Sequence, residues 1–448
     1  DGGGLPGGGG GRKMGRLGRG LGAKATSRSS SASSFPEKGG TEKLVYDALL
    51  TLLKGAGIVV SFTCLGAAVG AIVGLVSGLM VGACFALLTL GLSLWIGAIV
   101  GLLVGNFVGG VAGCVFGLRQ CAAWAESRLL YHPQENSSMH TAERWTSALG
   151  MLRGRRYLVE RITYSLTPWA WGKPLQQQAY FLRPEPSGGP VDELWVLFGG
   201  NAMLATDWLP YCQEWLLLDP NYSETRIAFL LVDYPGYGGN VGKPSPSSVL
   251  EASVQALRTT LAQVEGPQPR INLLGHSLGA AAAAQLAVRL AGCGVPAGRL
   301  VMSAPFTDIP NMTLHLAGLL LRPAPTPQVK KLEEMPVVAL LQTLWPWLRP
   351  LALALLTVLV PHRWANLKML PQAARAGWAV TIVHGAKDTL VPPRMGCELC
   401  ALGQSVAAKS QIPEAAARVR LVEVPEAGHN EVLQVALPAY AKVMGLVD

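Results

Sequence analysis

The sequence predicts an α/β protein in which an open, mostly parallel sheet follows a membrane-spanning helical hairpin. Over residues 157–448, short runs of Val, Ile and Leu alternate with helical stretches, a pattern typical of parallel strands joined by helices. Residues 55–118 contain no Asp, Glu, Lys, Arg or His. Half of the residues, 50%, are hydrophobic and only 15% are charged, and the mean hydropathy is +0.32. This composition is too apolar for an ordinary soluble protein and indicates a membrane.

Residues 1–50 form a Gly-rich and Ser-rich segment with many Arg and Lys residues. Such a segment cannot bury enough apolar surface to fold, so we expect disorder. Its composition fits an organellar targeting segment, or a basic tail on the side of a membrane that carries positive charge. The formal net charge of the chain is +9, but the sequence contains no basic patch interleaved with aromatic residues. Nucleic acid is therefore not an expected partner.

Residues 51–118 are predicted to form two transmembrane helices. One span needs about 20 apolar residues, so the uncharged block is too long for one helix and barely long enough for three. Lys54 and Arg119 flank it. An even number of crossings places the tail and the rest of the chain on one side, which we expect to be cytoplasmic or stromal. The sequence thus predicts a multi-pass intracellular membrane protein whose first partner is the lipid bilayer.

Glycines recur at every fourth position in both predicted helices. Residues four apart lie on one helical face, so each helix has a smooth stripe along which another backbone can approach. This glycine zipper predicts a tightly packed hairpin, and a homo-oligomer built from the same helices stays an open alternative. Without an intramembrane charge we expect no ion path. The glycines are Gly66, Gly70, Gly74, Gly78 and Gly82, then Gly97, Gly101, Gly105, Gly109, Gly113 and Gly117.

Residues 119–156 are mixed and charged and are expected to be a linker, after which the catalytic domain occupies residues 157–448. Two strands, 157–166 and 177–182, alternate apolar and polar residues as edge strands do, whereas later strands have the dense apolar composition of buried parallel strands. The expected later strands cover residues 194–198, 227–232, 271–274, 299–303, 380–383 and 419–424, and the expected helices cover about 247–264, 278–292, 394–408 and 431–446.

Residues 307–370 interrupt this alternation with a run rich in Leu, Trp and Pro. The run occupies the place of a helical cap inserted between two strands. An apolar cap would favour substrates with acyl or alkyl chains. Helices that pack on the sheet or lie in the bilayer surface have the same composition and stay an alternative.

Ser277 is the candidate nucleophile. It lies in Gly275-His-Ser-Leu-Gly279, between a predicted strand and a predicted helix. A serine at such a sharp turn is exposed at the carboxyl edge of the sheet, and flanking glycines avoid collisions with neighbouring backbone.

A serine hydroxyl needs a base within hydrogen-bond reach, and an acid that orients the base. His429 follows the last predicted strand and is the candidate base. Asp388 follows the preceding predicted strand and is the candidate acid, with Asp308, after an earlier strand, as the alternative.

An oxyanion hole needs two backbone N–H groups aimed at the developing charge. Leu278, directly after Ser277 and at a helix N-terminus, supplies one. The loop after strand 194–198 supplies the other from Asn201 or Ala202, with Asn201 favoured.

Together these motifs resemble the alpha/beta-hydrolase superfamily, and within it the membrane-anchored alpha/beta-hydrolase domain-containing serine hydrolases. The resemblance covers about residues 157–448, and its motifs occur in the family's order: oxyanion loop, nucleophile, acid, histidine. Asp233 and Tyr237 match the family's Asp-x-Pro-Gly-x-Gly turn, to which we assign structural work. The chain departs from the family at Phe198, where relatives usually have histidine, which leaves the amide that donates open. The resemblance implies an alpha/beta-hydrolase fold with helices on both faces of the sheet and a helical cap.

The predicted function is a membrane-anchored serine hydrolase that cleaves an ester or thioester of a hydrophobic, lipid or acylated, substrate. An acyltransferase would use the same residues, and a non-catalytic binding or scaffold protein could keep the fold. A glycine-zipper membrane protein with a secondary soluble half is a third alternative. The sequence shows no zinc-type Cys/His spacing and no disulfide framework among its 8 cysteines, so no metal, cofactor or disulfide is expected.

Overall fold

The computed structural model describes residues 40–132, 149–150, 152–154, 156–167, 173–185, 190–219, 226–320, 336–409 and 418–447. The predicted tail over residues 1–39 and the polar segment 134–140 of the predicted linker lie outside these residues.

Two long helices form the predicted hairpin: α1 (Gly40–Cys84) and α2 (Leu92–Leu129). The chain reverses between them through Leu90 and Gly91, which have φ angles of 49° and 86°. Among the described residues, two helical segments are long and apolar enough to cross a membrane, Lys54–Cys84 and Leu92–Trp124, with mean hydropathies of 2.3 and 2.1. Helix α1 begins ten residues before the end expected for the disordered tail, because residues 41–50 contain no Gly or Pro and lead directly into the span.

The two glycine ladders face each other inside the hairpin. A Cβ atom on Gly74 would lie 2.0 Å from the carbonyl oxygen of Gly101, and a Cβ on Gly105 would lie 2.1 Å from that of Gly70. Real Cβ atoms do not approach so closely, so only glycine permits this helix separation. Large apolar side chains cover the opposite faces and are exposed, including Ile72, Met80, Trp95 and Phe107. The ladders are therefore used within one hairpin.

Eight strands form one sheet in the order β1-β2-β4-β3-β5-β6-β7-β8. β1 pairs with β2 and β2 with β4 in antiparallel fashion, and the other pairs are parallel. The strands are β1 (Tyr157–Leu166), β2 (Leu175–Pro184), β3 (Glu193–Phe198), β4 (Ile227–Val232), β5 (Arg270–His276), β6 (Arg299–Ser303), β7 (Ala379–Gly385) and β8 (Val419–Val424).

The alternating pattern predicted two edge strands at the N-terminal end of the domain, and one of these predictions was wrong. β1 is an edge, but β2 lies between β1 and β4, and its centre is buried. The other edge is β8, which was expected to be a buried strand and is only partly buried. An edge strand that packs helices on one face keeps apolar residues there, so apolar density alone does not identify an inner strand.

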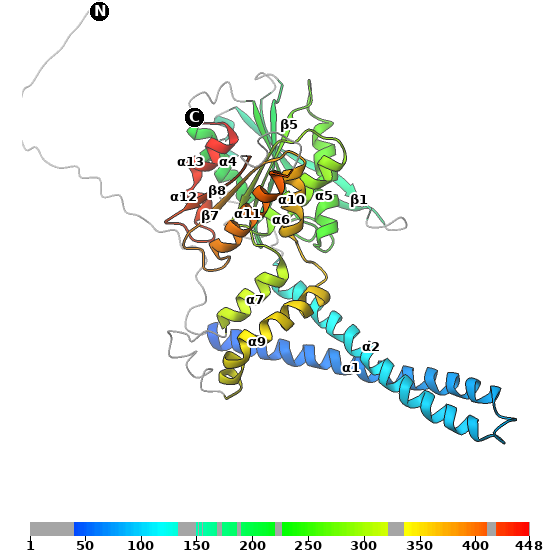
Figure 1. The fold of residues 1–448 in the computed structure, drawn as a ribbon. Coiled ribbons are helices and arrows are strands. Elements are labelled where there is room, and N and C mark those ends of the chain that lie inside the picture. Colours follow the sequence, from blue (N-terminus) through cyan, green and yellow to red (C-terminus); the bar gives the residue numbers. More distant parts are fainter. Residues whose placement is uncertain are drawn as a thin grey trace, which may run out of the picture. The chain divides into compact units, whose positions relative to one another are not determined.

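Helices cover both faces of the sheet, as predicted (Figure 1). Along β3, Leu194 and Val196 belong to the core on one face, whereas Trp195 and Leu197 belong to the core on the other. The first face packs α5 (Pro246–Leu261), α6 (Leu278–Gly292), α10 (Asn366–Arg375) and α11 (Pro393–Ala407), and the second packs η2 (Ala205–Trp208), α4 (Leu209–Leu218), α12 (Val432–Val435) and α13 (Leu437–Met444).

The segment predicted as a cap contains α7 (Ile309–Leu320) and α9 (Pro336–Leu359). Its expected end at residue 370 is too late, because α10 packs against α6 and α11 on the sheet. Helix α9 contacts α7 and exposes large apolar side chains, among them Trp347 at 82% and Val358 at 69%.

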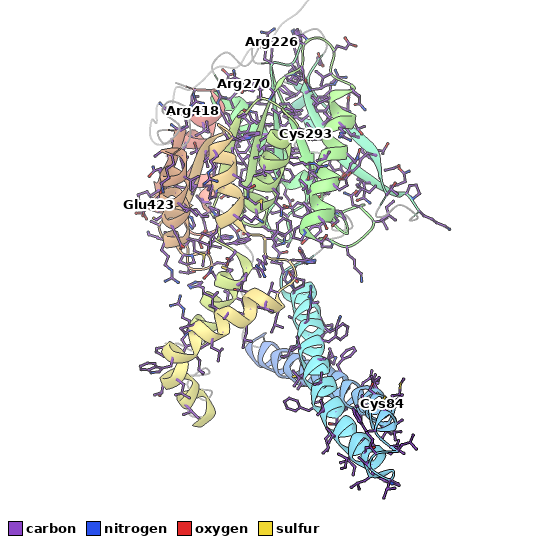
Figure 2. The ribbon with its side chains drawn as sticks, turned by 45° about the vertical axis from the view of Figure 1, so that its right-hand side comes forward. Cys84, Arg226, Arg270, Cys293, Arg418 and Glu423 are labelled. Atoms are coloured by element: carbon purple, nitrogen blue, oxygen red, sulfur yellow. The ribbon has the colours of Figure 1, made fainter. Side chains whose placement is uncertain are left out.

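The carboxyl ends of β3, β5, β6, β7 and β8 share one edge of the sheet because these strands are parallel. Arg226, Arg270 and Arg418 lie at the amino ends of β4, β5 and β8 and mark the opposite edge (Figure 2). The predicted site residues therefore lie on loops that leave the sheet at one edge.

Candidate active site

Ser277 lies at a strained turn between β5 and α6. Its φ and ψ angles are 55° and −113°, an unusual conformation for a residue with a side chain. Its amide donates to the carbonyl oxygen of Ser303 at 2.8 Å. A Cβ on Gly275 would lie 2.0 Å from the carbonyl oxygen of Gly279, and one on Gly279 would lie 2.1 Å from that of Phe198. Both glycines are therefore needed for the turn, and Ser277 is left partly exposed at its tip.

The structure brings Ser277, His429 and Asp388 together in one hydrogen-bonded chain. Nε2 of His429 is 3.0 Å from Oγ of Ser277, and its Nδ1 is 2.7 Å from Oδ2 of Asp388. The three side chains come from the loops after β5, β7 and β8, so segments far apart in the sequence meet at this edge of the sheet. With the hydrogen on Nδ1, the His429 ring donates to the carboxylate and its Nε2 accepts from the hydroxyl.

The Asp388 carboxylate is buried and held in its ionised form. Burial raises its pKa, but hydrogen bonds from His384 and His429 outweigh burial and bring the pKa below its ordinary value. Oδ1 accepts the backbone N–H groups of Leu390 and Val391 at 3.0 and 2.8 Å. Each of these donors stabilises the charged carboxylate, so Asp388 can hold His429 in one tautomer.

His276, the neighbour of Ser277, is a buried residue of the site to which the sequence assigned no role. Burial first, and then the nearby His429, lower the pKa of His276 to about 3, so the ring is neutral. Its Nδ1 is 3.0 Å from the hydroxyl of Ser303, which also accepts from Tyr440 at 2.7 Å. The His276 and His429 rings lie 5.1 Å apart. A neutral ring adds packing against the base without a competing charge.

Asp308, the alternative acid, has a different role. Its Oδ1 accepts from the backbone and side-chain amides of Asn311, both at 2.8 Å, at the start of α7. This is the hydrogen bonding of a helix N-cap, so the carboxylate of Asp308 stabilises the start of α7.

The two segments predicted to form the oxyanion hole lie beside Ser277. Leu278 is the first residue of α6, so its N–H has no acceptor within the helix. The loop after β3 passes close to the nucleophile, because a Cβ on Gly200 would lie 3.5 Å from the Cβ of Ser277. The Gly200 N–H points to the sulfur of Met203 at 3.2 Å.

Asn201 and Ala202 follow Gly200 in this loop, and the choice of Asn201 as the second donor stays a prediction. The Tyr237 hydroxyl donates to Oδ1 of Asn201 at 3.1 Å, and burial raises the pKa of Tyr237 to about 12. Ala202 itself has a φ of 65°, a left-handed conformation that turns the chain after Asn201.

The Asn201 side chain is held by residues that the sequence did not connect with it. Its Oδ1 accepts from the backbone N–H of His132 at 3.0 Å and from the Tyr237 hydroxyl at 3.1 Å, and its Nδ2 is 2.8 Å from Nδ1 of His132. Tyr237 was expected to have a structural role, and through this hydrogen bond it supports the loop after β3. His132 carries no pattern that could have identified it, because it lies 69 residues before Asn201.

Asp233 belongs to the same Asp-x-Pro-Gly-x-Gly turn as Tyr237, and it also supports the loop after β3. Its Oδ1 accepts the Ala205 N–H at 2.6 Å. Burial raises its pKa to about 7. The adjacent Tyr234 hydroxyl donates to the carbonyl oxygen of Gly199 at 2.5 Å. Over the described residues, no group of three His, Cys, Asp or Glu side chains is arranged to hold a metal ion.

Known proteins resemble parts of this chain. An uncharacterized protein of Mycobacterium tuberculosis is 30% identical over 207 residues, which are 46% of this chain and 54% of that protein. A lysophosphatidylserine lipase of zebrafish, Danio rerio, is 36% identical over 77 residues, 17% of this chain and 20% of that protein. The chain thus spans about half the length, or less, of these curated relatives. A solved esterase of Pyrococcus furiosus superposes with a TM-score of 0.41 at 14% identity, covering 65% of this chain and 91% of that one.

A sequence model of the alpha/beta hydrolase family matches residues 195–441, more than half of the chain. The match begins in β3, contains Ser277, Asp388 and His429, and ends in α13. The chain belongs to the alpha/beta hydrolase family.

Proposed function

We propose that this protein is a membrane-anchored serine hydrolase that cleaves an ester or thioester bond of a hydrophobic, lipid or acylated, substrate. Ser277 is the nucleophile, His429 the general base and Asp388 the residue that orients the base. The backbone amides of Asn201 and Leu278 form the oxyanion hole. The observation that carries the proposal is the unbroken hydrogen-bonded chain from the Ser277 hydroxyl through His429 to Asp388, at 3.0 and 2.7 Å.

Two steps follow from this arrangement. In the first, Oγ of Ser277 bonds to the substrate carbonyl carbon while its proton passes to Nε2 of His429, and the two amides receive the negative charge of the carbonyl oxygen. The proton then moves to the leaving alcohol or thiol as its bond to the carbonyl carbon breaks, and an acyl-serine remains. In the second step, His429 takes a proton from water, the oxygen bonds to the acyl carbon, and Ser277 leaves with the proton.

Three observations support a hydrophobic substrate and a bilayer location. The hairpin contains two segments of sufficient length and apolarity to cross a membrane. Helix α9, which lies in the segment inserted between β6 and β7, exposes Trp347, Leu351 and Val358. A short stretch of the chain is also similar to a lipase that is named for lysophosphatidylserine. A single-chain lipid or an acylated protein would present its ester at such a surface.

The proposal is tested by labelling the full chain, in detergent or lipid discs, with a fluorophosphonate that reacts only with an activated serine. We expect the wild-type protein to label and Ser277→Ala to be silent, with the label located at Ser277 by mass spectrometry. Ser303→Ala is the matched control, because Ser303 also lies at a strand end but bonds to Tyr440 and His276. A folded wild-type protein that does not label contradicts the hydrolase.

The same preparation separates a hydrolase from an acyltransferase. The products of a long-chain thioester are measured with water alone and with an added alcohol. Free acid in both mixtures supports hydrolysis. Ester formed in preference to acid at low alcohol concentration would assign the acyl-serine to transfer instead.

A further inference from the structure

We propose that His132, in the segment that follows the second membrane helix, is a positioning residue for the oxyanion hole. The inference rests on the proposed function, since it concerns the amide of Asn201 that would bind the developing oxyanion. It adds a residue that lies outside the part of the chain matched by the hydrolase family, residues 195–441.

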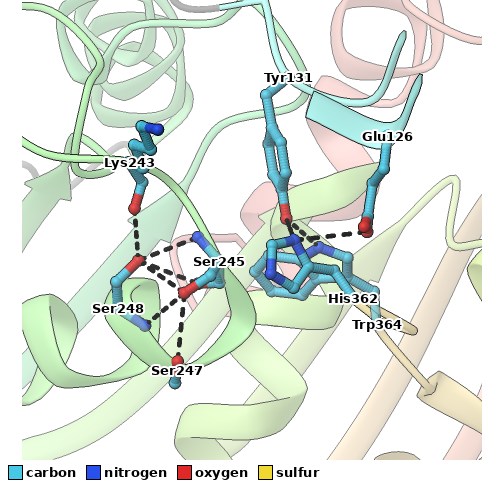
Figure 3. A network of polar contacts seen from close by, with 8 residues as sticks. All are labelled: Glu126, Tyr131, Lys243, Ser245, Ser247, Ser248, His362 and Trp364. Atoms are coloured by element: carbon cyan, nitrogen blue, oxygen red, sulfur yellow. Dashed lines mark hydrogen bonds and ion pairs between the residues drawn. The ribbon is translucent and has the colours of Figure 1, made fainter. Parts of the chain in front are cut away.

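The segment that contains Tyr131 and His132 is held in place by contacts of Tyr131 before the chain reaches Asn201. Tyr131 is buried, and its hydroxyl accepts the indole N–H of Trp364 at 2.9 Å and lies 3.1 Å from Nδ1 of His362 (Figure 3). Glu126, near the end of α2, approaches the same histidine at 3.4 Å (Figure 3). The chain therefore leaves α2 along a defined path, and His132 is the next residue after its anchor Tyr131.

His132 binds both polar ends of one side-chain amide. Its backbone N–H donates to Oδ1 of Asn201 at 3.0 Å, and its ring Nδ1 accepts from Nδ2 at 2.8 Å. The Tyr237 hydroxyl donates to the same Oδ1 at 3.1 Å. Two donors at one end and one acceptor at the other determine the orientation of the amide, and they place the hydrogen of the His132 ring on Nε2.

The hydrogen bonds between His132 and Asn201 constrain the loop over residues 199–204, which contacts Ser277. Gly200 lies against Ser277 and His276, and Ala202 has a left-handed φ of 65°, so the Asn201 peptide is confined between a close contact and a strained residue. Strained loop conformations persist only where surrounding contacts hold them. Releasing the Asn201 side chain would let the peptide rotate, and its N–H would then miss the oxyanion while Ser277, His429 and Asp388 kept their geometry.

The test compares His132→Ala with His132→Asn in the full chain. Alanine keeps the backbone N–H but removes the ring acceptor, whereas asparagine can place Oδ1 near the position of the lost Nδ1. We expect His132→Ala to lower kcat on a soluble p-nitrophenyl ester about 10- to 100-fold with KM nearly unchanged, because an oxyanion donor acts in the transition state. His132→Asn should recover most of that loss. The matched control is Gln255→Ala, which removes an exposed side-chain hydrogen bond of 2.9 Å on α5.

A second measurement does not depend on activity. Hydrogen exchange of the loop over residues 199–204 should be faster in His132→Ala than in wild type and near the wild-type rate in His132→Asn. Unchanged kcat and unchanged exchange in His132→Ala would overturn the proposal, as would an equal loss in both variants. Failure of the wild-type protein to label at Ser277 would instead contradict the proposed function, and the exchange rates would still decide whether His132 holds the loop.

Discussion

The serine turn and the helical hairpin of α1 and α2 both use glycine to bring two backbones into contact, but they differ in how often that contact is repeated. In both, a missing Cβ lets one backbone touch another: Gly279 against Phe198 in the turn, and Gly105 against Gly70 in the hairpin. The hairpin repeats that contact along eleven glycines of two ladders, whereas the turn uses Gly275 and Gly279 once each. A repeated contact can lose one member and keep its partners, and a single contact cannot.

The difference predicts where the molecule tolerates change. At the sheet edge each residue is held by a few specific partners: Ser277 is bound to Ser303, His429 to Asp388, and Asn201 to His132 and Tyr237. In the hairpin the glycine contacts are alike, so each contributes a similar part of the stability. Together they set the distance between the two helices more than their orientation. We therefore expect losses at the sheet edge to be nearly complete and losses in the hairpin to be graded.

The largest effect is expected from Asp388→Asn. The amide cannot stabilise a charged imidazolium and favours the wrong tautomer of His429, so kcat should fall by about 10³ to 10⁴. The measurement is steady-state turnover of a soluble ester. Asp308→Asn is the matched control, because Asp308 only caps α7, and its variant should stay within about threefold while losing up to about 1 kcal/mol of stability. A comparable loss in both variants would mean that the acid has been misassigned.

A slightly smaller effect is expected from Gly279→Ala. The added Cβ would meet the carbonyl oxygen of Phe198 at 2.1 Å, so β3 and the start of α6 must separate. We expect fluorophosphonate labelling at least about 10²-fold slower, since a misplacement near 1 Å costs that much. Gly292→Ala, at the end of α6 with open space around it, should label like wild type. Equal labelling of the two variants would show that the turn tolerates a side chain.

The hairpin counterpart is Gly105→Ala, with Gly110→Ala as its control. A Cβ on Gly105 would lie 2.1 Å from the carbonyl oxygen of Gly70, whereas one on Gly110 would lie 3.6 Å from the Cβ of Ala67, an ordinary contact. Overpacking of this kind costs about 1–3 kcal/mol. We expect a lower melting temperature of α1 and α2 in detergent for Gly105→Ala only. Labelling of Ser277 should change less than about twofold, and a loss as deep as that of Gly279→Ala would contradict the graded behaviour.

The same contrast explains how far the sequence could predict the structure. Both ends of all eight strands were placed within two residues, because dense apolar runs and glycine turns are local signals. Ser277, Asp388 and His429 could be chosen because residues after parallel strands converge at one edge. The edge position of β8 could not be predicted, since strand order depends on pairing between distant segments.

The side-chain contacts of the loop after β3 could not be predicted from the sequence, for a similar reason. His132 and Asn201 belong to segments 69 residues apart, and neither the ring nor the amide has a periodicity to reveal the pairing. His276 was visible next to Ser277, but its burial and its contact with Ser303 depend on β6 lying beside β5. Local patterns predict elements and loops, whereas side-chain partners across the sheet edge require the packed fold.

The smallest effect concerns Glu126, near the place where the hairpin meets the hydrolase-fold domain. Burial raises its pKa from the ordinary value of 4.5 to about 7, and His362 is the ionisable neighbour at 3.4 Å. A raised carboxyl pKa means that the folded state binds a proton more tightly than the unfolded state, so stability falls as pH rises from about 4.5 through about 7. Glu126→Gln mimics the neutral acid.

We expect Glu126→Gln to match wild type at pH 4 and to be more stable at pH 8 by about 1–2 kcal/mol, which corresponds to a rise of a few degrees in Tm. The control is Glu214→Gln on α4, an exposed glutamate whose substitution should give parallel curves at both pH values. If Glu126→Gln were instead less stable than wild type at pH 8, the ionised carboxylate would be bound to a protonated His362. The hairpin and the hydrolase-fold domain would then be joined by an ion pair, a single oriented contact of the kind found at the serine turn. A stabilising substitution means that they are joined by packing and neutral hydrogen bonds, which tolerate change as the glycine ladders do.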